Sequence, residues 1–168
     1  RVGVQLFVPS PAQVRVLEPG IAEPFQEPVR IARSLSEYSR VGRTEHRVHL
    51  RGQVTYPVRD KVLYLRDAGG SVRIETDQTN PVVQVGDLVD CAGFVAPSLF
   101  APVITDAIFK IATHGAAVSA IPLSFAQAVS GKFDSELVSL RARLVEIDPI
   151  SETQSGLLLE SDQRIFRG

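Results

Sequence analysis

The chain has 168 residues, with 18 lysines and arginines against 19 aspartates and glutamates, and 44% of its residues are hydrophobic. This length suits one domain or two small ones, and the apolar content is sufficient for a packed core. A charged fraction of 22% excludes an acidic disordered chain and a coiled coil. The net charge of −1 gives no global basic field of the kind that attracts nucleic acids.

Two local features limit the class of protein further. Cys91 is the single cysteine, so neither an intrachain disulfide nor a cluster of thiolate zinc ligands can form. Its place in an apolar alternation predicts a small buried side chain. The uncharged run 111–131 contains histidine, glycine, proline and glutamine among few large aliphatic residues, which does not fit a transmembrane helix.

Two short elements are predicted before residue 46. The apolar segment 14–17 predicts a strand, and it follows a proline-containing turn. Residues 32–40 predict a short helix within a connector.

A long, half-buried strand is predicted at 46–56. Val48, Leu50 and Val54 fall on one face of this strand, and polar residues alternate with them on the other. Gly52 interrupts the apolar face, where a missing side chain allows the strand to bend sharply.

Four more strands follow in the middle of the chain. Residues 61–66 and 71–76 predict a hairpin joined by Asp67-Ala68-Gly69-Gly70, whose glycines supply the positive φ of a tight turn. Residues 88–95 and 103–111 also show the apolar alternation of strands.

The second predicted helix, at 125–130, is also short. Ser124 suits its N-cap and Gly131 its C-cap. Because no long periodic helix competes with the strands, the chain is predicted to be all-β.

Several short motifs recur at a nearly constant spacing. The matches are Leu6-Phe7-Val8-Pro9 with Leu99-Phe100-Ala101-Pro102, Val48-His49-Leu50-Arg51 with Val138-Ser139-Leu140-Arg141, and Leu63-Tyr64-Leu65 with Leu157-Leu158-Leu159. Their constant order, at offsets between 90 and 94 residues, indicates an internal repeat.

The repeat unit predicts a small five-stranded Greek-key barrel of the OB type, because it has five closely spaced strands, of which the first is longer than the others and bent. We expect tandem OB-like barrels, with one complete copy and two half-copies. The expected division is 1–17 as strands four and five of a preceding copy, 18–45 as a connector with a short helix, 46–111 as the complete barrel, 112–133 as a second connector with a short helix, and 134–168 as strands one to three of a following copy.

Each half-copy would expose unpaired strand edges, which favour pairing with another chain. We therefore expect residues 1–17 to complete residues 134–168, either within one molecule or between neighbours. Strand-exchanged self-association is the corresponding partner prediction.

Five segments of the chain resemble a known family. They are VHLRGQVTY at 48–56, LYLRDAGG at 63–70, VGDLV at 85–89, Gly93, and FAPV at 100–103. They are similar to the tandem OB-like modules in the extracytoplasmic sensory regions of bacterial sensor histidine kinases and diguanylate cyclases. In that family the barrels lie between a signal peptide and a membrane helix, and the catalytic transmitter lies beyond that helix.

The resemblance implies a non-catalytic sensory module that binds a small molecule or a protein. It implies a place in the periplasmic part of a bacterial inner-membrane protein, with membrane contact only through the parent protein. The chain itself carries no kinase motif, so any kinase or cyclase domain would belong to that parent.

OB barrels usually bind through the face of strands two and three. Here that face can present Tyr64, Arg66, Arg73 and Glu75, which are the candidate ligand-binding residues. One tyrosine with two arginines suits a small anionic ligand. Binding of single-stranded nucleic acid needs several aromatic platforms in a basic groove, so a nucleic-acid partner is disfavoured, and an OB-fold single-stranded nucleic-acid-binding protein is the alternative function.

The sequence offers no reaction chemistry. His46 and His49 are three residues apart in a predicted strand, so their side chains leave opposite faces and cannot share a metal; we interpret them as surface histidines beside an arginine. The chain also lacks a nucleophile elbow, an HExxH motif and a phosphate-binding loop. We therefore predict no catalytic residue, no metal ligand and no cofactor.

Overall fold

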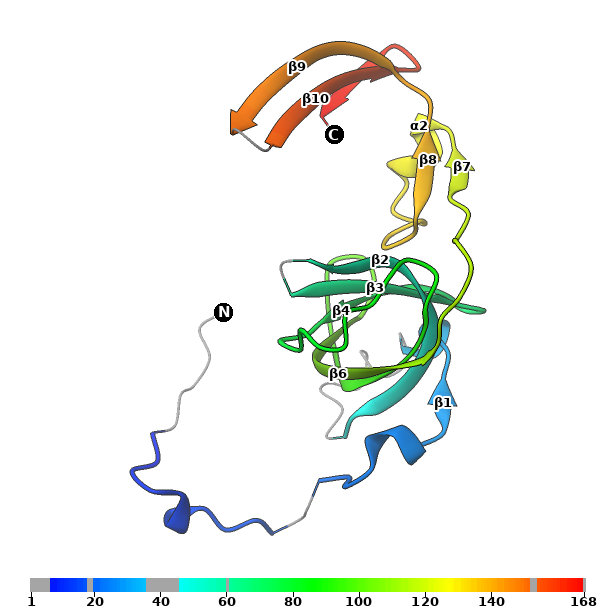
Figure 1. The fold of residues 1–168 in the computed structure, drawn as a ribbon. Coiled ribbons are helices and arrows are strands. Elements are labelled where there is room, and N and C mark those ends of the chain that lie inside the picture. Colours follow the sequence, from blue (N-terminus) through cyan, green and yellow to red (C-terminus); the bar gives the residue numbers. More distant parts are fainter. Residues whose placement is uncertain (1–6, 18–19, 36–45, 60, 152–153, 168) are drawn as a thin grey trace.

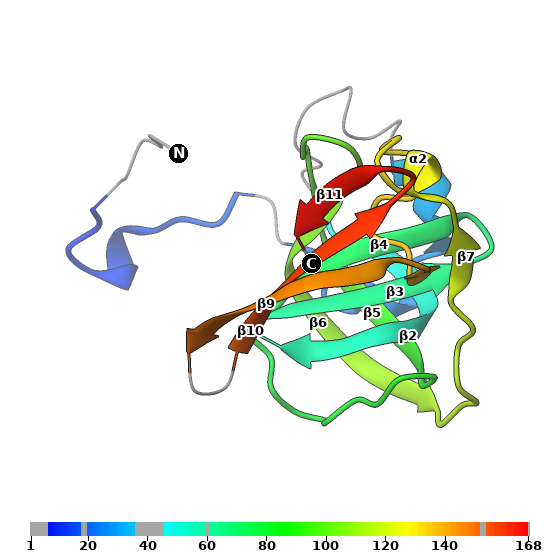
Figure 2. The ribbon, with the colours of Figure 1, turned by 90° about the horizontal axis from the view of Figure 1, so that it is seen from above.

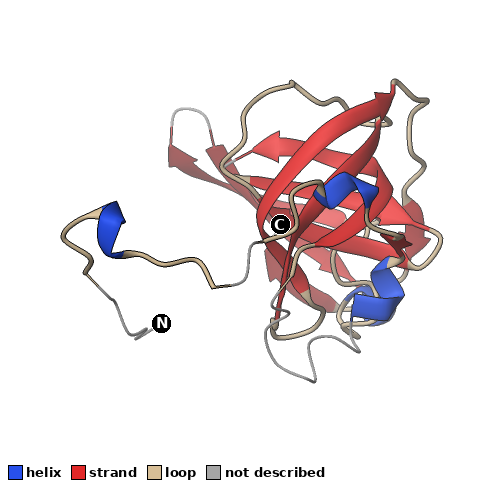
Figure 3. Cartoon of the chain, turned by 90° about the horizontal axis from the view of Figure 1, so that it is seen from below, coloured by secondary structure: helices blue, strands red, loops and turns tan. Residues whose placement is uncertain are grey.

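The computed structural model describes residues 7–17, 20–35, 46–59, 61–151 and 154–167. Strands dominate their regular structure, and the helices are short (Figure 3). A barrel occupies the middle of the molecule, and a curved three-stranded sheet lies over one side of it (Figure 1). The prediction of an all-β chain is confirmed.

The barrel is closed by five strands. These are β2 (Val48–Arg59), β3 (Val62–Asp67), β4 (Gly70–Glu75), β5 (Leu88–Ala96) and β6 (Val103–Thr113). They are hydrogen-bonded in the order β2-β3-β4-β6-β5, and β5 pairs again with β2 (Figure 2). The β4–β6 pair is parallel and the others are antiparallel, which is the closure of an OB-like Greek-key barrel. All five strands were predicted to within three residues at either end.

Gly52 allows β2 to serve two neighbours. Residues 48–53 pair with β5, and from Gln53 onward the strand pairs with β3. A Cβ at Gly52 would lie 3.0 Å from the carbonyl oxygen of Arg66 and 3.1 Å from Cβ of Leu65. A side chain at position 52 would therefore crowd β3 at the point where β2 changes its pairing partner.

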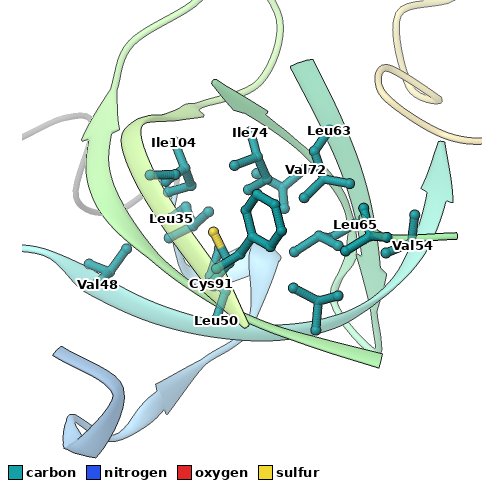
Figure 4. Packing of buried hydrophobic residues seen from close by; sticks show 14 of the residues in the cluster. Leu35, Val48, Leu50, Val54, Leu63, Leu65, Val72, Ile74, Cys91 and Ile104 are labelled. Carbon is teal, nitrogen blue, oxygen red and sulfur yellow. The ribbon is translucent and has the colours of Figure 1, made fainter. Parts of the chain in front are cut away.

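The interior of the barrel is filled by the alternate apolar residues of all five strands (Figure 4). Leu35 packs among them with 1% of its surface exposed, although it comes from the connector before β2. Cys91 is fully buried in this core, as predicted. The largest fully buried side chains are Leu35, Leu50, Leu63, Leu65, Ile74, Ile104, Val54, Val89, Val95 and Cys91.

Side chains of the loop after β4 complete the hydrogen bonding of β6. The amide of Gln78 donates to the carbonyl of Phe109 at 2.8 Å and accepts from its N–H at 2.9 Å. The hydroxyl of Thr76 donates to the carbonyl of Ala107 at 2.6 Å. The loop thus takes the place of a strand where the short parallel pairing of β4 with β6 has ended.

The N-terminal region is built from short elements. They are the 3₁₀ helices η1 (Pro11–Gln13), η2 (Pro24–Gln26) and η3 (Ala32–Ser34), and the strand β1 (Val29–Arg30), which pairs in parallel with β2. The prediction of a strand at 14–17 is wrong, since these residues adopt no regular structure and pair with no described strand. A strand forms only when a neighbouring strand pairs with its backbone N–H and C=O groups, and no described strand lies beside 14–17. The helix predicted at 32–40 begins as η3, and residues 36–40 lie outside the described ranges.

The C-terminal region starts with β7 (Ile121–Leu123), which pairs in parallel with β8 (Val138–Leu140). Between them lies α2 (Phe125–Ala128), which begins with the predicted cap Ser124 in a complete capping box. Gly131 was predicted as the C-cap, and this is wrong, because the C-cap is Val129 and Gly131 lies two residues beyond it with a left-handed φ of +74°.

An antiparallel sheet of β9 (Arg143–Ser151), β10 (Gln154–Ser161) and β11 (Arg164–Arg167) follows. The order of a short parallel strand, a short helix and a three-stranded meander resembles the order of β1, η3 and β2–β4. In the described residues the sheet has three strands, and the segment 7–17 does not join it. None of the described helices reaches the length and apolar character of a membrane span.

Candidate functional site

A cavity of about 580 Å³ lies on the outside of the barrel, against β2, β3 and β4. One wall comes from these strands, and the other comes from the segment 135–137, which leads into β8. We call it the tyrosine cavity; its lining residues are Thr55, Tyr56, Val62, Tyr64, Arg73, Ser135, Glu136 and Leu137.

The two tyrosines meet at the centre of the strand wall. Tyr56 and Tyr64 are directly opposed in the β2–β3 register, and their rings pack edge to face with centroids 6.1 Å apart. Tyr56 is 41% exposed. The register shifts between Val54 and Tyr56, so β2 carries an extra residue there. This bulge turns Tyr56 away from the core face of Val54 and places it beside Tyr64.

Arg73 provides the positive charge of the cavity. Its guanidinium lies 3.2 Å from Glu75 and is partly exposed. The Nε atom is buried and has no hydrogen-bond partner in the part of the chain that the structure describes. An acceptor group on a ligand would satisfy this donor.

Arg66 has a different role from the one predicted. Its Nε donates to Glu136 Oε2 at 2.9 Å, and its terminal nitrogens donate to the carbonyls of Ser119 at 3.0 Å and Leu137 at 3.1 Å. Ser71 donates to the same carboxylate oxygen of Glu136 at 2.8 Å. Arg66 therefore fastens the second connector to the barrel and lies outside the cavity lining.

The four predicted ligand-binding residues are divided by the structure. Tyr64 and Arg73 line the tyrosine cavity. Glu75 lines a neighbouring cavity of about 260 Å³, which it shares with Arg73. Tyr56 was missed because strict alternation along β2 places it with Val54, and only the bulge reverses it. The segment 135–137 was missed because no local pattern indicates that it returns to the barrel.

His49 is buried, so the expectation of a surface histidine is wrong. It is 3% exposed, because η2 and β1 cover this part of β2 and the ring of Phe25 packs edge-on against it at 5.8 Å. Its Nδ1 lies 2.8 Å from the carbonyl oxygen of Glu27, and its Nε2 lies 2.9 Å from Asp90 Oδ1. Arg51 forms two hydrogen bonds with the same carboxylate, at 2.8 and 3.0 Å.

Asp90 is the charged centre of this cluster. Burial of its carboxyl raises the pKa, but the hydrogen bonds from Arg51 and His49 outweigh burial and leave the pKa below its ordinary value. The pKa of Arg51 is raised, mainly by the same hydrogen bond. The cluster joins the first connector to β2 and β5, which is a structural role.

A second carboxylate, Asp87, organises the turn before β5. The backbone N–H of Gln84 donates to it at 2.9 Å, and His114 Nδ1 lies 2.9 Å from its other oxygen. These contacts, the backbone bond first, lower the pKa of Asp87. Within the described ranges, no three histidine, cysteine, aspartate or glutamate side chains gather closely enough to hold a metal ion.

Comparison with known proteins gives a likeness among solved structures alone. No family model matches the chain, and no curated protein matches it. Among solved structures, the chain is similar to the hypothetical protein ygiW from E. coli, at 21% sequence identity and a TM-score of 0.40. The match covers 51% of this chain and 91% of that protein.

Proposed function

We propose that this chain is a non-catalytic binding module whose ligand occupies the tyrosine cavity. The observation that carries the proposal is the shape of that site, because the strands of the barrel form one wall and the segment 135–137 forms the other. A ligand there contacts both the barrel and the chain that leads to the next sheet. Occupancy would therefore change how firmly this segment is held.

The lining indicates the chemical class of the ligand. The two tyrosine rings stand nearly perpendicular, at 82°, and offer apolar ring surface, and Arg73 offers a guanidinium with a buried, unsatisfied Nε. Glu136 is already engaged by Arg66 and Ser71. A small molecule with a planar apolar body and a carboxylate or phosphate fits this arrangement.

We further propose that the chain is a sensory module of a membrane-bound bacterial signal-transduction protein, in its periplasmic part. The support for this is the resemblance of the barrel motifs to the sensory OB-like family. In such a protein, ligand binding would hold the segment 135–137 more firmly against the barrel, and this change would be transmitted to the rest of the parent protein.

Single-stranded nucleic acid is the second candidate ligand, because Tyr56 adds a second aromatic platform beside Tyr64. The charges of the same face argue against it. Three cations of this face lie against a carboxylate: Lys61 with Asp77 at 2.6 Å, Arg66 with Glu136 at 2.9 Å, and Arg73 with Glu75 at 3.2 Å. A groove that follows a phosphate backbone needs cations that are free to replace counterions.

The test is titration of the chain with benzoate, 4-hydroxybenzoate and indole-3-acetate, followed by amide chemical shifts in NMR. We expect saturable shifts at Tyr64, Arg73 and the segment 135–137, and no such shifts with neutral benzamide. Tyr64→Ala and Arg73→Met should each weaken binding about tenfold or more, which is about 1.4 kcal/mol. Arg143→Met, in the distant sheet, is the matched control and should leave binding unchanged.

Two results would contradict the proposal. One is an absence of saturable shifts at the cavity with all three anions. The other is tight binding of oligo-dT, measured by fluorescence anisotropy, that weakens steeply with salt and depends on both Tyr56 and Tyr64, because this would assign the site to nucleic acid.

A further inference from the structure

The C-terminal sheet has one apolar face that resembles the inside of the barrel. The register places Leu144, Leu159 and Phe166 in one row, and Ile147 with Leu157 in the next. Leu144, Ile147 and Leu157 are 49%, 55% and 37% exposed. A contiguous apolar face of a sheet is rarely left this exposed, and such a patch usually marks a binding surface.

The opposite face of the same sheet is mostly charged, although Leu158 lies on it between Glu146 of β9 and Arg167 of β11. Arg143 forms an ion pair with Glu160 across β9 and β10, and Arg167 lies 3.3 Å from Asp148. Ile165 also lies on this side, because it is paired with Glu160. The sheet therefore has one face for solvent and one face for a core.

The short helix α2 identifies which side corresponds to a barrel interior. Phe125 of α2 is 9% exposed and packs against Phe166, with ring centroids 4.9 Å apart. In the complete barrel, Leu35, which directly follows η3, fills the interior in the same way. Among the described residues, the apolar face is thus covered at one end by its own helix, and Leu144, Ile147 and Leu157 remain exposed.

The segment 7–17 carries the pattern of a strand that would cover this face. Its Phe7 and Pro9 match Phe100 and Pro102 at an offset of 93 residues. The same offset places Val14 and Val16 on Ala107 and Phe109 of β6, each 3% exposed in the barrel. It places Gln13 on the exposed Asp106. In the segment itself Val14 and Val16 are 58% and 70% exposed.

We propose that residues 12–17 of a second copy of this chain cover the apolar face on the side of β11, as residues 105–110 of β6 close the barrel beyond its short pairing with β4. The order of the chain favours a second copy over the same one. In the barrel, β6 leaves through a connector and enters the next unit. The segment 12–17 likewise leads through residues 20–28 into a complete barrel, so a head-to-tail row of copies repeats that order.

The position of the barrel supports the same choice. Figure 1 shows the barrel between the C-terminal sheet and β1, into which the N-terminal segment leads. A segment that covered the sheet of its own chain would have to return past the whole barrel. A head-to-tail contact joins two different surfaces, so each added copy carries one free segment and one free face, and the expected product grows with concentration into a ring or an open row of copies.

The test uses the full chain and two complementary variants in analytical ultracentrifugation. We expect the wild-type chain to associate with rising concentration. The double variant Val14→Asp/Val16→Asp should prevent the segment 12–17 from inserting, while its apolar face stays intact. The variant Ile147→Asp should prevent the apolar face from accepting a segment, while its own segment 12–17 stays intact. Each should be monomeric alone, and their mixture should form one-to-one dimers and nothing larger.

Two matched controls distinguish this contact from non-specific hydrophobic association. Gln13→Asp introduces the same charge beside Val14, at the position where β6 itself has aspartate. Ile165→Asp makes the same substitution as Ile147→Asp on the polar face, at a residue that is 64% exposed. Both should associate like the wild type. Since Ile147 and Ile165 are both largely exposed, neither change is expected to unfold the sheet.

Three outcomes would overturn the proposal. The wild-type chain could remain monomeric at all concentrations. It could associate without any effect of the segment variants. It could also remain monomeric while the amides of 12–17 are protected from hydrogen exchange, which would assign the segment to its own chain.

Discussion

Arg66 of the barrel and Glu136, which follows the second connector, form an ion pair with Nε and Oε2 2.9 Å apart, although 70 residues separate them in the chain. Both side chains are largely buried, at 21% and 13% exposure. The same guanidinium also holds the carbonyls of Ser119 and Leu137. The side chain of Arg66 thus binds both the second connector, at Ser119, and the residues that follow it, at Glu136 and Leu137.

Removing this arginine should release the connector without unfolding the barrel. Arg66→Met keeps the aliphatic stem and loses all of these hydrogen bonds, each of which is charge-assisted and contributes about 1.5–3 kcal/mol. We expect amides in 117–123 and 136–140 to exchange with solvent at least about tenfold faster, measured by hydrogen–deuterium exchange. Amides of β5 should keep their protection. Unchanged exchange in the connector would mean that other contacts hold it.

The strands of the barrel could be predicted because their signals are local. The alternation of Val48, Leu50 and Val54, the bend at Gly52 and the glycine turn before Gly70 all lie within a few residues of the structure they specify. The candidate site could be predicted only in part. Tyr64 follows from the alternation of a single strand and the usual OB binding face.

What could not be predicted depends on distant parts of the chain. Tyr56 faces the cavity because of a bulge that is defined by the register with β3. Arg66 is engaged because Glu136 returns to it, and His49 is buried because β1 pairs alongside it. The segment 14–17 has the pattern of a strand, but a strand also needs a partner, and the sequence of one strand does not say where that partner is.

Gln78 should be important for the stability of the barrel, although it lies in a loop. Gln78→Ala removes both hydrogen bonds to the backbone of Phe109, a residue that is 3% exposed. A buried N–H and carbonyl without partners cost about 1–3 kcal/mol each, so we expect a loss of about 2 kcal/mol in the free energy of unfolding, measured with urea. Gln84→Ala, at an exposed position in the same loop, is the control and should change stability by less than about 0.5 kcal/mol. Equal effects of the two variants would refute this role.

Asp90 should make the barrel sensitive to acid. Its pKa in the folded chain lies below the ordinary 3.8, so its contribution to stability is present above that pH and is lost as the pH falls through the folded pKa. Asp90→Asn removes the charge that faces Arg51 and His49, and it should cost about 2 kcal/mol at neutral pH. The difference between the variant and the wild type should shrink in acid. Urea unfolding at several pH values measures this, and a difference that is independent of pH would contradict it.

Cys91 should be chemically inert in the folded protein. Burial, with a smaller effect from the charge of Asp90, raises its pKa to about 12, against 9.0 for an ordinary thiol. The raised pKa means that its contribution to stability is complete below pH 9.0 and declines only above it. We expect Ellman's reagent to label the native chain at mildly alkaline pH only through unfolding, and to label it rapidly in urea. Because β5 pairs with both β2 and β6, Cys91 should become accessible only when the barrel unfolds. The labelling rate should therefore be proportional to the fraction of unfolded chains. Rapid labelling of the native chain would show instead that β5 opens locally while the rest of the barrel remains folded.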